Sequence, residues 1–303
     1  MSDEQAVAHR PLRGVIALLL ALLLLTSAVA TFLLLKKSAP VDVGVRFTAG
    51  DTLRFHMIMD VSGVTLSGTS PVPAEDEIQA DVAWQVMSVD GRGTATVVQT
   101  VTNPTMTSNG LPVTLSDLPP TTMTVRADGR SGASSGVALF SGGAPGPAQA
   151  GIARPLAFLP GHDVRPGDTW STQVSQPFWG SALSYHATST FLRREQLGNA
   201  DAVVIESDAT VPVDLTVKVA DFAGILALPT GLIPKGATAS YVGSLNGTTT
   251  TSWVDPADGS LLQTVSRGNF SMRLVLQGFP KSVLNGDGTG SLSGELSMQL
   301  VRI

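Results

Sequence analysis

Few residues in this sequence have the types and spacing of a reactive site. Gly132-Ala133-Ser134-Ser135-Gly136 has the Gly-x-Ser-x-Gly form of a nucleophile elbow, in which the serine stands on a sharp turn between a buried strand and a helix. Here the pattern lies inside a stretch rich in Ser, Gly and Ala, whose composition produces it without any catalytic role. We therefore predict no catalytic residue and expect that the chain is not an enzyme.

Metal chemistry is equally poorly supported. Asn285-Gly286-Asp287-Gly288-Thr289-Gly290 begins like a calcium loop, but its twelfth position is Leu296 and not the glutamate that completes the cage. Cysteine is absent, and the three histidines beyond residue 37 (His56, His162 and His186) do not have the spacing of zinc ligands. We expect no metal site and no cofactor.

Aromatic and methionine side chains are the remaining candidates. Packing in a core is their default interpretation. If a strongly curved sheet leaves its inner face unfilled, however, the same side chains would line an apolar pocket, because thioethers and aromatic rings adapt to irregular ligands. The candidate lining residues are Met57, Met59, Trp84, Trp170, Trp179, Phe191 and Met272.

These side chains must be positioned by strands, because apolar residues alternate with polar ones through much of the chain after residue 45. The first predicted strand carries Leu53, Phe55, Met57, Met59 and Val61 on one face. A hairpin follows, with Asp90-Gly91 expected at the positive-φ turn positions and apolar alternation over 82–86 and 95–101. Further strands are predicted at 121–127, 261–265, 270–276 and 292–301, and the last of these is expected to pair with the first and close the sheet.

Other segments lack this alternation. Residues 62–78, which include Glu75-Asp76-Glu77, are predicted to form a solvated loop or an irregular hairpin, and residues 130–147 a mobile connector. Short helices are predicted at 148–158 and 217–228.

Two parts of the chain carry similar landmarks in the same order. Gly50-Asp51-Thr52 and Gly167-Asp168-Thr169 each precede a predicted strand, and Asp128-Gly129 and Asp258-Gly259 each follow a threonine run. This order predicts a degenerate duplication, with units at about 46–129 and 164–303 joined by a connector at 130–163. A simple series of hairpins is the alternative.

The longest apolar run lies near the N-terminus. Residues 14–35 contain no charged side chain and are long enough to cross a bilayer core of ~30 Å as a helix. Cleavage of a signal peptide after Ala30 is the alternative, since Ala28-Val29-Ala30 has the small-x-small form. Apolar residues continue beyond Ala30 to Lys36-Lys37, and this favours a retained anchor.

The flanking charges do not fix the orientation, because Arg10 and Arg13 balance Lys36 and Lys37. The remaining 266 residues, free of cysteine and rich in turns, are typical of an exported domain. We therefore predict a cytoplasmic tail (1–13), a single-pass anchor in the cell membrane (14–35), a spacer (36–45) and an extracytoplasmic β domain (46–303). Residues 38–303 have a net charge of −7, so nucleic acid is not an expected partner.

Several of these segments resemble uncharacterised exported bacterial proteins that have an N-terminal anchor or lipid attachment and a β domain. The resemblance rests on Gly50-Asp51-Thr52-Leu53-Arg54-Phe55, on the hairpin at 84–91, on Phe158-Leu159-Pro160 and on residues 164–170. It covers most of residues 46–275 and implies no particular activity. The layout is also similar to that of periplasmic lipoprotein carriers, which have a curved sheet and a few covering helices.

The predicted fold is mainly β: an N-terminal transmembrane helix, then a curved antiparallel sheet or open barrel-like domain with two degenerate repeats and one or two short helices. The favoured function is non-catalytic binding of an apolar ligand or a cell-envelope component, with the lipid bilayer contacted through residues 14–35. The alternative is a structural or protein-interaction domain of the envelope without a pocket. An envelope hydrolase is the least favoured.

Overall fold

The computed structural model describes residues 40–67, 70–113, 120–135, 158–178, 181–220, 233–280 and 288–303. Residues 42–303 form one compact unit. The predicted tail and anchor (1–35) lie outside the described residues, as do Trp179, residues 285–287, and most of the two predicted helices.

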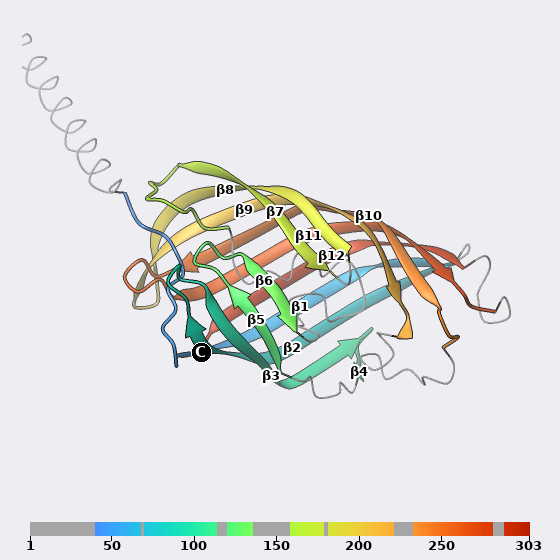
Figure 1. Cartoon of the computed structure of the whole chain (residues 1–303). Helices are drawn as coiled ribbons and strands as arrows, with labels where there is room; N and C mark the ends of the chain where they lie inside the picture. The colour runs from blue at the N-terminus through green and yellow to red at the C-terminus, as the bar shows by residue number, and fades with distance from the viewer. Residues whose placement is uncertain are drawn as a thin grey trace, which may run out of the picture. The chain divides into compact units, whose positions relative to one another are not determined.

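The described residues are organised as strands (Figure 1). They are β1 (Thr52–Ser67), β2 (Ser70–Val89), β3 (Ala95–Ser108), β4 (Leu111–Val113), β5 (Thr121–Val125), β6 (Ser131–Ser135), β7 (Thr169–Phe178), β8 (Ser181–Leu197), β9 (Ala200–Lys218), β10 (Thr238–Val254), β11 (Leu261–Gln277) and β12 (Thr289–Arg302). All pair antiparallel in a single sheet of order β6-β5-β3-β2-β1-β12-β11-β10-β9-β8-β7, and β4 pairs only with β3.

The first and last strands are neighbours in the middle of this sheet (Figure 1). The predicted pairing of β1 with β12 is confirmed, and Met59 lies opposite Met298 in that ladder. The prediction that this pairing closes the sheet is wrong, because β6 and β7 are the two edges. These edge strands lie close together, yet no ladder joins them among the described residues. The sheet is therefore open.

Alternation along the strands directs one face into the core. Phe55, Met57 and Met59 are at most 4% exposed, whereas Arg54 and Asp60, on the opposite face, are exposed. The same period of two holds in β2, β3 and β12, so the predicted inner faces of the first strand and first hairpin are confirmed. The core is the set of side chains on this inner face.

Glycines allow the strands to bend where β1, β11 and β12 meet. Gly63 lies opposite Gly294, and Gly294 lies opposite Phe270. A Cβ on Gly63 would come within 2.5 Å of the Ser293 carbonyl oxygen, so no side chain fits there. Such close backbone approach is typical of a sharp bend in a strongly coiled sheet.

The two Gly-Asp-Thr turns have the same backbone geometry. Gly50 has φ 93° and Gly167 has φ 95°. Gly50 N donates to Val86 O at 2.8 Å and Val86 N donates to Asp51 O at 2.9 Å. In the second turn Gly167 N donates to Phe191 O at 2.7 Å and Phe191 N donates to Asp168 O at 3.0 Å.

The strands that receive these turns are also alike. A β-bulge follows Val86 in the β2–β3 ladder, and another follows Phe191 in the β8–β9 ladder. The turn between β5 and β6 places Gly129 at φ 77°, and the turn between β10 and β11 places Gly259 at φ 71°. Gly129 N donates to Arg126 O, and Gly259 N donates to Asp255 O. Each of these backbone bonds closes its turn.

Several segments differ from the sequence-based expectation. Residues 62–78 were predicted as a solvated loop or an irregular hairpin, and residues 62–67 and 70–78 are regular paired strand in β1 and β2. Pro71 and Pro73 are tolerated because β2 has only β1 beside it there. β6 lies within the predicted connector, and Val43 and Val45, at the end of the predicted spacer, are buried. The helix predicted from 217 cannot begin there, since residues 217–218 belong to β9.

One turn differs in detail. Gly93, not Gly91, takes the positive φ in the β2–β3 turn. Asp90 Oδ1 accepts from the backbone N–H groups of Arg92 and Thr94, both at 2.8 Å, and these bonds lower the pKa of the Asp90 carboxyl below its ordinary value.

Candidate binding site

A row of hydroxyl groups crosses the inner face of β8, β9, β10 and β11. Ser189 lies opposite Ser207, Ser207 opposite Thr250, and Thr250 opposite Ser266. All four are at most 6% exposed. Ser189 Oγ and Ser207 Oγ are 2.7 Å apart, and Thr250 Oγ1 and Ser266 Oγ are 3.0 Å apart. These bonds make it possible to bury hydroxyls beside an apolar core.

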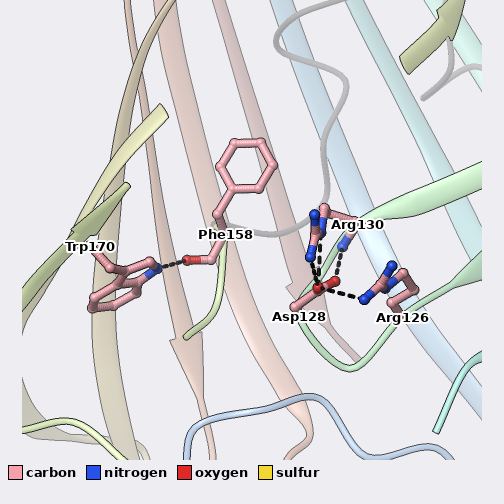
Figure 2. A network of polar contacts seen from close by, with 5 residues as sticks. All are labelled: Arg126, Asp128, Arg130, Phe158 and Trp170. Carbon is pink, nitrogen blue, oxygen red and sulfur yellow. Dashed lines mark hydrogen bonds and ion pairs between the residues drawn. The ribbon is translucent and has the colours of Figure 1, made fainter. Parts of the chain in front are cut away.

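The row holds the backbone of one residue from outside the sheet. Phe158 N donates to Ser207 Oγ at 3.0 Å. Trp170 Nε1 donates to Phe158 O at 3.0 Å (Figure 2). The Phe158 ring packs edge-to-face on Tyr185, with centroids 6.4 Å apart. Both polar groups of the Phe158 backbone are therefore bound by side chains from β7 and β9.

The adjoining residue reaches the other half of the sheet. Leu159 N donates to Asp128 O at 3.2 Å, in the turn between β5 and β6. Val45 N donates to Ala127 O at 3.0 Å in the same turn, and Arg46 N donates to Gly259 O at 3.3 Å. Residues 43–46 and 158–160 thus cover one end of the inner face and tie its two halves together.

Asp128 anchors this end with two arginines (Figure 2). Its Oδ2 lies 2.6 Å from Arg130 Nη2 and 3.4 Å from Arg126 Nη2. Burial raises the pKa of the Asp128 carboxyl, but hydrogen bonds from Arg130 and the charges of both arginines outweigh it, so this pKa lies below its ordinary value. The pKa of Arg130 is raised in turn, chiefly by its hydrogen bond to Asp128.

A hollow of about 390 Å³ lies beside this cluster. It is lined by residues 42, 44, 90, 92, 94, 126–128 and 160–161. Its carboxylates already have bonds within the chain: Asp42 with Arg46, Asp90 with its own turn, and Asp128 with the arginines. We assign no ligand to this hollow.

A different pair of polar groups lies on the inner face of β2 and β3. Trp84 and Gln99 are opposite one another in the ladder and are 0% and 2% exposed. Trp84 Nε1 and Gln99 Oε1 have no hydrogen-bond partner within the described part of the chain. Unpartnered buried polar atoms are rare and cost about 1–3 kcal/mol each. This donor and acceptor are the main candidates for contact with a bound molecule.

The structure places most of the predicted lining residues on one face. Met57, Met59, Trp84, Phe191 and Met272 are buried. Met57 lies opposite Leu300, and successive cross-strand partners lead from Leu300 to Phe191. Met57 and Phe191 therefore lie in one row across the sheet. Trp170 is half-buried, and its indole nitrogen is bound to Phe158. Trp179 lies outside the described residues.

The sequence reasoning missed Gln99, Ser207 and Phe158 as polar parts of this face. Gln99 lies within the strand predicted from the alternation over 95–101, where it shares a face with Ala95 and Val97. A buried glutamine in an otherwise apolar alternation (Ala95, Val97) was the available signal, because such a side chain needs a hydrogen-bond partner. The Phe158 contact had no such signal, since it depends on tertiary structure.

The outer face carries a separate polar group of His56, Asp81 and Asn103. His56 Nδ1 is 3.0 Å from Asp81 Oδ1, and Asn103 Nδ2 donates to Asp81 Oδ2 at 3.0 Å. The bond to His56 and then that from Asn103 lower the pKa of the Asp81 carboxyl. The His56 and Asp81 side chains are 41% and 39% exposed. Such exposure is typical of a polar pair on the protein surface.

The weaker sequence motifs can be compared with the described residues. Ser134 stands opposite Met123 in the β5–β6 ladder, whereas an elbow serine would occupy a sharp turn. Across the described ranges, no group of three or more His, Cys, Asp or Glu side chains is placed to hold a metal ion. No helix in the part of the chain that the structure describes is long and apolar enough to span a membrane.

Comparison with solved structures gives a distant likeness. The sequence matches no protein-family model and no curated protein. The chain is similar to the solved structure of DynF from the dynemicin biosynthesis pathway of Micromonospora chersina, with 10% sequence identity and a TM-score of 0.24. The match covers 87% of this chain and 85% of DynF. The resemblance to exported bacterial β domains stays a prediction.

Proposed function

We propose that this protein is a membrane-tethered extracytoplasmic binding module, without catalytic activity, that takes an apolar ligand or cell-envelope component against the inner face of its sheet. The observation that carries the proposal is the donor and acceptor pair of Trp84 and Gln99, buried among apolar side chains without a described partner. A bound molecule would supply that partner.

The composition of the inner face supports an adaptable ligand. Of the eight methionines in the chain, Met57, Met59, Met123, Met272 and Met298 are buried. Thioether side chains change rotamer easily and fill irregular spaces, so such a face accommodates flexible apolar molecules.

A second candidate function is a structural or partner-binding module with a filled core. The observation that favours it is the complete burial of Phe55, Trp84 and Phe191, each 0% exposed. The two candidates differ in whether a small apolar molecule enters the domain.

Photo-crosslinking separates them. Full-length protein in lipid nanodiscs is exposed to a dodecyl chain carrying a diazirine, and labelled peptides are identified by mass spectrometry. Labelling of strands β1, β2, β8 or β11 that an excess of untagged dodecyl compound prevents is the expected result. Labelling restricted to residues 14–35 would favour the filled-core module.

We also propose that the sheet is built from two related β units. The matched bonds of the Gly50 and Gly167 turns, the two bulges and the paired Gly129 and Gly259 turns support this proposal. In this proposal, β1 corresponds to β7, β2 to β8, β3 to β9 and β5 to β10.

The membrane tether is tested by fractionation. We expect full-length protein to remain with membranes through an alkaline carbonate wash, because residues 14–35 would be inserted as a helix. External protease should digest residues 38–303 in intact spheroplasts. A soluble protein whose N-terminus is Thr31 would instead identify a cleaved signal peptide.

A further inference from the structure

The site that binds Phe158 has a counterpart in the first half of the sheet. Val86 corresponds to Phe191, because each exchanges two backbone bonds with a Gly-Asp turn. Two positions earlier on the same strands stand Trp84 and Ser189, which therefore correspond as well.

The correspondence extends to the next strand. Trp84 lies opposite Gln99, as Ser189 lies opposite Ser207. Gln99 thus occupies the position of the hydroxyl that accepts the hydrogen bond from Phe158. One strand further, Thr121 lies opposite Gln99 as Thr250 lies opposite Ser207.

Both places offer the same chemistry: an indole N–H and a side-chain oxygen. In the second half, Trp170 Nε1 and Ser207 Oγ bind the C=O and the N–H of a single residue. In the first half, Trp84 Nε1 and Gln99 Oε1 are a donor and an acceptor of the same kinds. Trp84 supplies its indole N–H from the position of Ser189, because Leu53 stands at the position of Trp170. The group that satisfies both has a carbonyl oxygen beside an N–H.

We infer that Trp84 and Gln99 bind the secondary amide group of an apolar ligand, with Trp84 Nε1 donating to the amide oxygen and Gln99 Oε1 accepting from the amide N–H. This inference rests on the proposed binding function and adds the chemical class of the ligand. The Phe55 ring, edge-to-face with Trp84 at 5.4 Å, supplies an apolar wall beside the amide.

The burial of this pair predicts two properties of binding. Both atoms are closed off from water, so the amide must enter the interior, and surrounding side chains must move to admit it. Association should therefore be slower than binding to a preformed site, because it requires a conformational change. An ester of the same length should bind about tenfold or more weakly, because it leaves Gln99 Oε1 facing a second acceptor.

The experiment compares N-dodecylacetamide with dodecyl acetate. Full-length protein in nanodiscs is labelled by a diazirine-tagged N-dodecylacetamide, and each untagged compound is tested as a competitor. We expect the amide to compete at about one tenth of the ester concentration or less. In Trp84→Phe, which keeps an aromatic ring but removes the indole N–H, and in Gln99→Met, which keeps the length of the side chain, this preference should fall towards unity.

The control is Trp253→Phe. Trp253 Nε1 donates to Glu195 Oε1, so this variant loses an indole N–H away from the proposed site, and the amide preference should remain. Thermal unfolding establishes that each variant is folded. Equal competition by amide and ester in the wild-type protein would overturn the amide inference while leaving apolar binding intact. Absence of any competed label in the β domain would overturn both proposals.

Discussion

The ring of Phe270 lies directly over Gly294, so that a Cβ on this glycine would be 2.7 Å from Phe270 Cζ. The same Cβ would be 2.1 Å from the Ser62 carbonyl oxygen on the neighbouring strand. Gly294 therefore accommodates both the aromatic ring and the close approach of the β1 backbone.

Gly294→Ala should destabilise the protein by about 3 kcal/mol, at the upper end of overpacking effects, because the neighbouring backbone must shift. Chemical denaturation measures the change. Gly91→Ala is the matched control, since no atom lies within 4 Å of its Cβ position and its φ is not positive; it should change stability by about 0.5 kcal/mol or less. Equal effects of the two variants would contradict the proposed close packing.

The Phe158 site allows a second test. Ser207→Ala removes the acceptor for Phe158 N and the partner of Ser189 Oγ, all within the core, so we expect a loss of about 1–3 kcal/mol. Ser240→Ala is the control, because its bond to Thr216 Oγ1 is exposed and water replaces it. The free energies of unfolding of the two variants should differ by at least about 1 kcal/mol.

The sequence allowed the strands to be predicted better than their connections. Alternation of apolar residues such as Phe55, Met57 and Met59 is a local signal, and it identified the buried face correctly. The pairing of β1 with β12 was also predictable from their half-buried patterns. The lack of a ladder between β6 and β7 among the described residues was not predictable, because closure depends on how far the whole sheet curls.

The candidate site was less predictable. Met57 and Trp84 were named from residue type alone, and both face the core. The role of Phe158 arises because residues distant in sequence meet over β7 and β9, and no local pattern records that contact. The segment containing Glu75-Asp76-Glu77 resembled a loop because of its prolines, yet pairing with β1 makes it part of a strand.

The Asp128 cluster predicts a pH-dependent contribution to stability. The folded-state pKa of Asp128 lies below its ordinary value of 3.8, so its stabilisation is present above that value and is lost as pH falls through the lower folded pKa. Asp128→Asn should therefore cost about 1–3 kcal/mol at pH 7, and the difference from wild type should shrink as the pH falls below 3.8. Urea denaturation at several pH values measures this. The exposed Asp163→Asn variant should differ little from wild type at any of them. A constant deficit for Asp128→Asn down to pH 2 would contradict the ionic origin.

The final prediction tests the relation between the two β units through their opening turns. Gly50 and Gly167 have φ of 93° and 95°, and a Cβ at either position meets no atom within 4 Å, so an alanine suffers only the backbone strain of positive φ. Gly50→Ala and Gly167→Ala should each cost roughly 1–2 kcal/mol, and the two losses should agree within about 0.5 kcal/mol. The double variant should lose their sum, because the turns belong to β1 and β7, which are not neighbours in the sheet. Equilibrium unfolding of the three variants provides the values. A loss confined to one turn would show that the units do not depend on equivalent turns, and it would remove the basis for matching Gln99 with Ser207.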